Sequence, residues 1–341
     1  MQSPLPVRDG VNATRLRLPE EGPWETAMDY MMHRWGHIDP QGIADRFDAG
    51  EIVGEGGIPL DRTTPLRHHT FIWYYRTLPP ETRMPVELNI LHQDEHLLVV
   101  DKPHFLPTTP GGTYIQESAL VRLRNQLQLP DLIPMHRLDR MTAGILLLST
   151  NPETRGKYQV LFEKRQVQKE YECVSAAEPA PGHPAVDFPV VVRNRMTKSR
   201  SYLLAEVIEG EPNTETRIER LRTFAAAHAD GNSNGGPEHG GGTEHNNGTA
   251  DGGARRDSSP RRALYRLEPH SGKTHQLRVH MASLGLGIVN DAFYPDLLDK
   301  APDDYSKPLQ LLARGIRFVD PVSGKPVEYR SRLTLSEARA D

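Results

Sequence analysis

The sequence predicts an α+β fold, because short helical and strand-like patterns follow one another along the chain. Two segments, 24–35 and 40–49, carry apolar residues at helical spacing, and a strand-like run follows at 70–76. Residues 145–148 are all apolar, which is typical of a strand covered on both faces. Alternation over 167–174 indicates another strand, with one face made of Val167, Lys169, Tyr171 and Cys173.

The first part of the chain is expected to hold a lead-in and one small domain. Residues 1–23 are expected to be irregular, and 24–80 to form a small α+β domain. Gly50 ends the second helical pattern, as glycine often does. Pro79-Pro80 is typical of a linker.

The remaining elements follow from local patterns. Strands are expected over 86–90 and 97–100, and helices over 117–129 and from Asn151-Pro152 toward Arg165. Further on we expect a strand over 263–267, a helix capped by Thr274 that ends at Gly285, and strands over 309–313 and 316–319. Residues 209–262 interrupt the pattern, and 228–259, rich in Gly, Asn, His, Ser and Asp, are expected to be a disordered insertion.

Composition limits the classes of function. With 341 residues and a formal net charge of -4, the chain has no generally basic coat, so nucleic-acid binding would depend on local patches. One cysteine, Cys173, excludes an internal disulfide. The chain has neither a leading apolar segment nor a long apolar run, so we expect a cytoplasmic protein that does not enter a membrane. Irregular spacing argues against a metal site at His228, His239 and His245.

The stretch 133–150 is the strongest candidate for a functional site. Asp139 stands between Arg137 and Arg140, directly before the buried strand 145–148, so its side chain lies at the rim of a rigid sheet. Nearby guanidinium groups favour a carboxylate. Gly144 lacks a side chain where another backbone or a ligand could approach. The alternative interpretation is an ordinary capping aspartate in a loop.

Four blocks in a fixed order favour the catalytic interpretation. Residues 136–144, which read His-Arg-Leu-Asp-Arg-Met-Thr-Ala-Gly, resemble the active-site motif of the RluA-type RNA pseudouridine synthases. The opening strand and lysine-proline turn of that family resemble 90–103, its tyrosine motif resembles 169–171, and its late arginine motif resembles 271–280. The resemblance covers roughly residues 85 to 330, and four ordered blocks are far more specific than one.

The resemblance implies a fold and a chemistry. It implies a mixed, largely antiparallel central sheet with flanking helices over 85–330, and isomerisation of uridines in structured RNA without a cofactor or metal. Asp139 would be the catalytic aspartate, Tyr171 would stack on the uracil, and Arg278 would pair with Asp139. The small domain 24–80 is loosely similar to the S4 RNA-binding domain, although His68-His69 stand where that domain has a glycine-aspartate turn.

The expected partner is ribosomal or transfer RNA, bound by a monomer. Arg137 would occupy the gap left by the flipped nucleotide. Arg140 and the cluster Arg193, Arg195, Lys198 and Arg200 are the candidates for phosphate contact. Residues 287–295 resemble the family's glycine-aspartate-x-x-tyrosine-glycine turn, with Asn290 and Pro295 in place of the glycines.

Two other classes of protein stay open at this point. A glycosidase or nucleosidase could use Asp139 with a second carboxylate such as Asp291, but local spacing supplies no such pair. An RNA-binding protein with an inactive site is the other alternative. Release of free base would favour the first, and RNA binding without turnover the second.

Overall fold

The chain folds into two compact units in the computed structural model, which describes residues 2–78, 80–199, 204–226, 261–298 and 305–338. Unit 1 consists of Met1–Met141, Leu146–Lys164 and Asp320–Lys325. Unit 2 consists of Thr142–Ile145, Arg165–Val319 and Pro326–Asp341. The insertion predicted at 228–259, with its three histidines, lies outside the described residues.

Unit 1 begins with a small α+β module. Its elements are β1 (Thr14–Arg17), α1 (Ala27–Trp35), α2 (Pro40–Asp48), two 3-10 turns η1 (Glu55–Gly57) and η2 (Leu66–His68), and β2 (Phe71–Tyr74). Thr26 starts α1 by accepting a hydrogen bond from the Asp29 backbone, and the Asp29 carboxylate accepts one from the Thr26 backbone. Asp39 caps α2 through the Gly42 N–H. The module encloses its own core, which includes Met31, Phe47, Ile52, Leu60 and Ile72.

The prediction of an irregular lead-in over 1–23 was wrong. Residues Thr14–Arg17 form β1, which pairs antiparallel with β2, and Leu18 is buried in the core of the module. The strand was missed because two of its four residues are exposed arginines, which gives little apolar signal. An S4-like identity for this module stays a prediction.

The rest of unit 1 carries the elements around Asp139. They are β3 (Asn89–Gln93), β4 (Leu97–Lys102), α3 (Ala119–Leu127), β5 (Ile133–Pro134), α4 (Arg155–Glu163) and the last residues of β6 (Ala143–Ser149). Strand β4 is buried along its whole length. Helix α4 begins later than predicted, because the Asn151 carboxamide accepts from the Glu153 N–H and closes a turn first.

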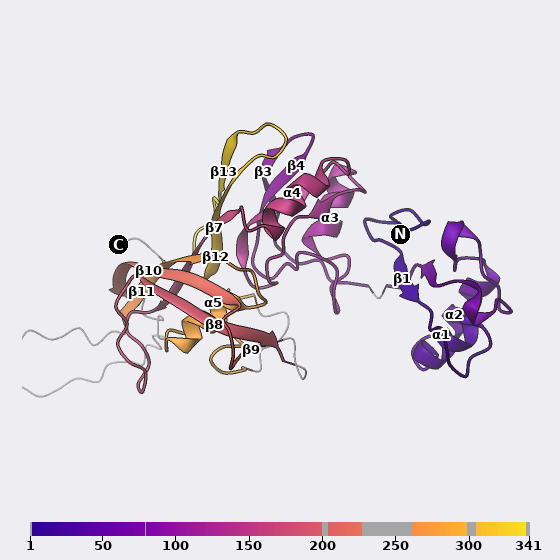
Figure 1. The fold of residues 1–341 in the computed structure, drawn as a ribbon, viewed down its shortest axis with the longest axis horizontal. Helices are drawn as coiled ribbons and strands as arrows, with labels where there is room; N and C mark the ends of the chain where they lie inside the picture. The colour runs from indigo at the N-terminus through magenta and orange to yellow at the C-terminus, as the bar shows by residue number, and fades with distance from the viewer. Residues whose placement is uncertain (1, 79, 200–203, 227–260, 299–304, 339–341) are drawn as a thin grey trace, which may run out of the picture. The chain divides into compact units, whose positions relative to one another are not determined.

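Unit 2 is built on one sheet. The strands run in the order β12 (Leu311–Val319), β7 (Gln168–Ala176), β11 (Arg261–Pro269), β10 (Thr214–Ala225), β8 (Val190–Lys198) and β9 (Ala205–Ile208), and β13 (Pro326–Arg330) pairs with β12. Helix α5 (Gln276–Ser283) lies against β9 and β10 (Figure 1). Among the pairings described, only that of β6 with β12 is parallel. The predicted mixed, largely antiparallel sheet with flanking helices is therefore confirmed.

Several boundaries differ from the sequence predictions. The twelve-residue strand β10 was missed, because it falls in 209–262, where charged residues alternate with a few apolar ones. The strands expected at 309–313 and 316–319 are one strand, β12, with a bulge between Ala313 and Gly315. His275, not Thr274, precedes the first turn of α5, with a left-handed φ of 55°.

Gly144 confirms the expected close approach of another backbone. It pairs with Ala313 of β12, and a Cβ built on Gly144 would lie 2.3 Å from the Ala313 carbonyl oxygen. Its φ of 112° is one that residues with a side chain rarely adopt. The position therefore requires glycine.

We expect Gly144→Ala to lower the free energy of unfolding by roughly 3 kcal/mol, because the methyl group would overlap the Ala313 backbone. Gly156→Ala is the control, since a methyl group there meets nothing within 4 Å. That variant should match the wild type or gain up to about 1 kcal/mol. Urea unfolding followed by circular dichroism measures both, and equal stability of the two variants would contradict the close approach.

Candidate active site

Asp139 lies in the loop between β5 and β6 and is partly exposed. The backbone on its N-terminal side is held by Thr108. The Thr108 hydroxyl donates to the Leu138 carbonyl at 2.8 Å and accepts from the Leu138 N–H at 3.1 Å. Both groups are buried, so this pair of bonds fixes the chain directly before the aspartate.

Lys102 holds the backbone on the other side of Asp139. Its ammonium, in a fully buried residue, donates to the carbonyls of Pro103 at 2.9 Å, Leu106 at 2.8 Å and Arg140 at 3.4 Å. Burial lowers the pKa of Lys102 to about 7, while the nearby charge of Asp139 acts in the opposite direction. The lysine of the predicted lysine-proline turn therefore ties the turn to the Asp139 loop.

His104 adds a third attachment. Its Nδ1 lies 2.7 Å from the Met141 carbonyl, to which only a protonated Nδ1 can donate. Burial lowers the pKa of His104 to about 4, the bond to Met141 opposes this shift, and the charge of Lys102 adds to it. The ring is therefore neutral at pH 7 and carries its proton on Nδ1.

The two arginines beside Asp139 differ. Arg140 donates from Nε to the Phe105 carbonyl at 2.9 Å, and its guanidinium lies 4.5 Å from the centre of the Tyr114 ring. Arg137 is exposed. Arg140 thus has a structural role in the loop, whereas Arg137 is exposed to solvent.

Tyr171 lies in the middle of the sheet of unit 2 and is partly exposed. Its strand, β7, does not neighbour β6, the strand that follows Asp139, because β12 lies between them. Ala313 pairs with Gly144 on one side and with Tyr171 on the other. Two strand spacings, about 10 Å, therefore separate Gly144 from Tyr171 within unit 2.

Arg278 is held in α5 with its side chain 2% exposed. Its Nε donates to Asp291 at 2.8 Å and its Nη2 to the other oxygen of the same carboxylate at 2.5 Å. The guanidinium also lies 4.8 Å from the ring centre of Phe293 and 5.4 Å from that of Tyr294. Asp139 belongs to unit 1 and Arg278 to unit 2, so the pairing of these two residues stays a prediction.

The turn that carries Asp291 is held by the side chains of Asn290 and Asp291. Asn290 has a left-handed φ of 64°, which asparagine tolerates better than most residues, and it donates to the Pro308 carbonyl at 3.0 Å. Asp291 also accepts from the N–H groups of Phe293 and Tyr294. Because its carboxylate is fully buried and committed to this turn, Asp291 is a poor second acid for a glycosidase.

Helix α5 is fixed by a buried polar network. His280 is fully buried, with Nδ1 2.9 Å from the Thr216 hydroxyl and Nε2 3.1 Å from both the Thr214 hydroxyl and the Asn194 carboxamide oxygen. Burial lowers the pKa of His280 to about 4. Gln276 donates to the Glu215 carbonyl and to Thr216, both at 3.0 Å. The network joins α5 to β8 and β10 and so sets the direction of Arg278.

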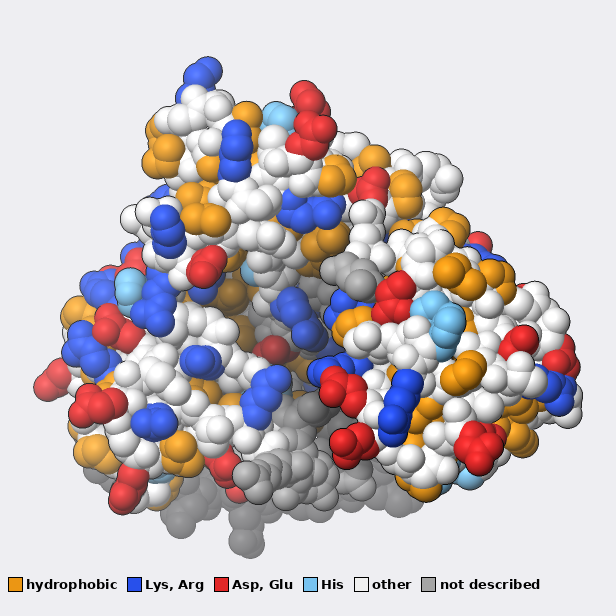
Figure 2. Space-filling model, turned by 45° about the vertical axis from the view of Figure 1, so that its right-hand side comes forward, with side chains coloured by type: hydrophobic (Ala, Val, Ile, Leu, Met, Phe, Trp, Pro, Cys, Tyr) orange, Lys and Arg blue, Asp and Glu red, His pale blue; other side chains and the backbone are white. Residues whose placement is uncertain are grey.

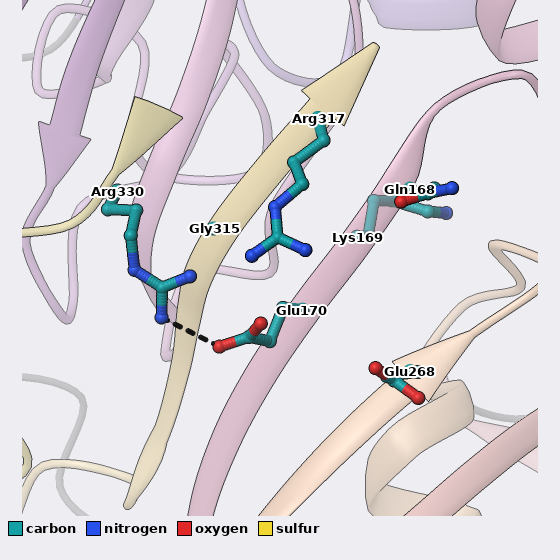
Figure 3. A pocket seen from close by; sticks show the side chains of 7 residues that line it. All are labelled: Gln168, Lys169, Glu170, Glu268, Gly315, Arg317 and Arg330. Carbon is teal, nitrogen blue, oxygen red and sulfur yellow. Dashed lines mark hydrogen bonds and ion pairs between the residues drawn. The ribbon is translucent and has the colours of Figure 1, made fainter. Parts of the chain in front are cut away.

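The Lys169-Glu170-Tyr171 motif also borders a shallow hollow. The hollow has a volume of about 40 Å³ and lies beside Arg317 and Arg330 (Figure 3). Arg330 pairs with Glu170 at 2.8 Å. Burial lowers the pKa of Lys169, whose ammonium donates to the Ser271 carbonyl at 3.4 Å. A space of this size holds a water molecule and no nucleobase.

The predicted cationic cluster is split by the strand that carries it. Arg193 and Arg195 point to one face of β8, whereas Lys198 shares the other face with buried Met196. Arg193 also pairs with Glu215 of β10 at 2.8 Å, and Arg200 lies outside the described residues. Figure 2 shows the same mixing of Lys and Arg with Asp and Glu over the visible surface.

The sequence predicts Asp139, Tyr171 and Arg278 as site residues, but it gives no sign of the groups that hold Asp139 and Arg278. Lys102 was noted only as part of a motif, and Thr108, His104 and Asp291 had no assigned positioning role. Within the described residues, no group of three or more His, Cys, Asp or Glu could hold a metal ion. None of the described helices is both long enough and apolar enough to span a membrane.

The comparison with known families agrees with the site motifs. A family model described as RNA pseudouridylate synthase matches residues 96–283, more than half of the chain. The chain therefore belongs to the RNA pseudouridylate synthase family, and it is an isomerase that converts uridine in RNA to pseudouridine.

Individual relatives support the same assignment. An uncharacterized RNA pseudouridine synthase of Synechocystis sp. is 26% identical over 274 residues, 78% of each protein. The dual-specificity RNA pseudouridine synthase RluA of Salmonella typhi is 28% identical over 247 residues, 71% of this chain and 92% of the relative. In fold, the solved structure of human RNA pseudouridylate synthase domain containing 1 aligns with a TM-score of 0.50 at 19% identity, over 74% of this chain and 86% of its own.

Asp291→Asn should lower the free energy of unfolding by about 3 kcal/mol or more, because it leaves the Arg278 guanidinium buried without its carboxylate. Glu328→Gln serves as the control. Glu328 pairs with Arg317 and Arg330 at 3.0 and 3.1 Å, but all three side chains are more than a third exposed, so the loss should stay below about 1 kcal/mol. Urea unfolding gives both values. Similar losses would mean that the two-bond fork from Arg278 to Asp291 contributes little to the free energy of unfolding.

The pKa of His104 predicts acid sensitivity. The folded-state pKa of about 4 lies below the unfolded value, so only the unfolded chain takes up this proton between pH 6.5 and 4. The free energy of unfolding should therefore fall with pH through this window, by roughly 2 to 3 kcal/mol from His104 alone. His104→Asn keeps a donor for the Met141 carbonyl and should remove that share, whereas exposed His37→Asn should not. Urea unfolding at pH 7 and pH 4.5 measures the difference, and parallel falls in all three proteins would contradict it.

Proposed function

We propose that Asp139 is the catalytic carboxylate of this RNA pseudouridine synthase. The observation that carries the proposal is the anchoring of the backbone around it, at Leu138 by Thr108, at Arg140 by Lys102 and at Met141 by His104. A reacting group must be held to within a fraction of an ångström by its support. An ordinary capping aspartate needs no such set of three separate attachments around it.

The reaction asks little else of the protein. The bond between ribose C1′ and uracil N1 breaks, the base turns, C1′ joins C5, and C5 loses a proton while N1 gains one. Atoms and electrons balance without an oxidant, a reductant or a group donor. The site must supply one carboxylate beside the sugar and a flipped-out uridine shielded from water.

Tyr171 and Arg278 are proposed as the partners of Asp139. A phenol ring in a partly exposed position can stack on the uracil. A guanidinium carries five N–H donors on three nitrogens, and we propose that Arg278 pairs with Asp139 as well as with Asp291. Arg137 is proposed to occupy the gap left by the flipped nucleotide, since it is exposed and planar cations stack on bases.

The proposal extends to the RNA contacts and the setting of the reaction. Arg195 and Lys198 are exposed and are proposed to contact phosphates, with Arg193, Arg140 and Arg200 as further candidates. Ribosomal and transfer RNA are both proposed as substrates. We also propose that the protein acts as a cytoplasmic monomer, in keeping with a single cysteine that is buried.

Asp139→Asn should reduce pseudouridine formation at least about a hundredfold while RNA binding is retained, because the change removes the carboxylate and preserves its shape. The substrate is total RNA from cells that lack the protein, and mass spectrometry of nuclease digests counts pseudouridine. Asp131→Asn is the control, since Asp131 is exposed in the preceding turn. Retained turnover in the Asp139 variant would contradict its role, and free uracil in the wild-type reaction would indicate a nucleosidase instead.

A further inference from the structure

The β1-β2 ribbon of unit 1 has two different faces. Register pairs Arg15 with Trp73 and Arg17 with Phe71, and cross-strand partners point to the same side. Leu16, Ile72 and Tyr74 point to the other side and belong to the core of the module. One face is therefore buried, and the opposite face carries arginines and aromatic rings.

Two guanidinium groups lie over aromatic rings here, one on this second face of the ribbon and one just beyond the end of the ribbon. The Arg15 guanidinium lies 4.9 Å from the centre of the Phe71 ring, and that of Arg8 lies 4.0 Å from the centre of the Tyr75 ring. Phe71 and Tyr75 are four residues apart, roughly 13 Å along a strand. Trp73 between them is buried, so the two accessible ring sites are separate.

Beside Tyr75 the surface is hollowed. A space of about 230 Å³ is lined by Arg8, Asn12, Thr14, Tyr75, Arg76 and Gln116, among others, and Asp9 supplies an acid. The N-terminal loop that forms one wall is fastened to α3, because Arg124 donates to the Gly10 carbonyl at 2.9 Å and Asn125 to the Asp9 carbonyl at 3.0 Å. The hollow is therefore formed before any ligand arrives.

We propose that the outer face of the ribbon (Arg15, Arg17 and Phe71) and the hollow beside it (Arg8, Tyr75 and Arg76) together bind a single-stranded segment of the substrate RNA away from the uridine that reacts. A base stacks on the Arg8 and Tyr75 pair, because rings and guanidinium planes are the usual platforms for unpaired bases. Asn12 and Gln116 offer amide groups to the base edge, and the exposed arginines meet phosphates. The proposal rests on the proposed function only for the source of the RNA.

The charge of the face favours RNA over an acidic or apolar partner. Arg17 pairs with Glu20 at 2.8 Å, but both side chains are more than 60% exposed, so a phosphate can compete for the arginine. Arg8, Arg15 and Arg76 bring three further exposed cations against the single acid of the hollow. The rings would stack on bases, which an acidic peptide does not offer.

Fluorescence anisotropy with a fluorescein-labelled oligoadenylate RNA tests the proposal on the full chain. This probe contains no uridine, so catalysis and the uridine pocket do not enter the result. Tyr75→Ala should weaken binding roughly tenfold, because it removes a stacking platform. Arg8→Gln should weaken binding and reduce the slope of log affinity against log salt by about one.

Two matched variants keep the result interpretable. Tyr75→Phe retains the ring and loses only the hydroxyl that donates to the Pro6 carbonyl, so it should bind like the wild type. Arg34→Gln removes a guanidinium that lies 5.1 Å from the Trp35 ring on α1, off the ribbon, and should also bind normally. Wild-type affinity in Tyr75→Ala, an equal loss in Arg34→Gln, or no binding of the probe by the wild type would overturn the proposal. Turnover by Asp139→Asn would leave this test untouched, so the two failures are separable.

Discussion

The buried ammonium of Lys102 is the interaction on which the loop around Asp139 depends. One cation with three N–H groups reaches carbonyl oxygens in two segments, the turn after β4 and the backbone at Arg140, and so fixes the distance between them. Burying that charge is costly, and the cost appears as a pKa lowered to about 7. The charge of Asp139 offsets part of it. Only the protonated form of Lys102 supplies three N–H donors, so the full set of bonds requires the ammonium.

In unit 2 a buried ion pair, Arg278 with Asp291, fixes the position of a proposed site residue. Arg278 and Asp291 are both buried, and a buried ion pair gains little net stability over apolar packing. The ion pair therefore serves to orient the Arg278 guanidinium. One orientation is left by the fork to Asp291, the rings of Phe293 and Tyr294, and the network at His280. Backbone strain is found at the same places. Phe105, His275 and Asn290 have φ values of 69°, 55° and 64°, and each lies beside a group that holds Asp139 or Arg278. Such strain persists only where surrounding bonds determine the geometry.

Sequence patterns predicted the parts of the fold whose signal is local. Three local patterns predicted structure correctly. They are the apolar run at 145–148, which lies in β6, the alternation around Tyr171, which lies in β7, and Gly144, which another backbone approaches closely. The insertion of β12 between β6 and β7 could not be predicted, because strand order depends on residues more than a hundred positions apart. The positioning roles of Thr108, His104 and Asp291 were missed for the same reason. A hydrogen bond to a carbonyl or guanidinium far away in the sequence produces no periodic pattern of residues. Strands β1 and β10 were missed because arginines occupy their exposed faces.

The slight negative charge of the chain sets the kind of RNA contact that it can use. With 45 acids against 41 Lys and Arg, long-range attraction to phosphates is weak, and a count of cations overstates what is available. Arg193 shows this, since the Glu215 carboxylate on the neighbouring strand lies 2.8 Å from its guanidinium and would compete with a phosphate. Affinity must then come from short-range contacts that salt screens little. Guanidinium groups stacked on rings meet this requirement, because one side chain offers a phosphate its charge and a base its flat surface. The pairs Arg8 with Tyr75 and Arg15 with Phe71 are of this kind, with both arginines exposed at the surface of the module.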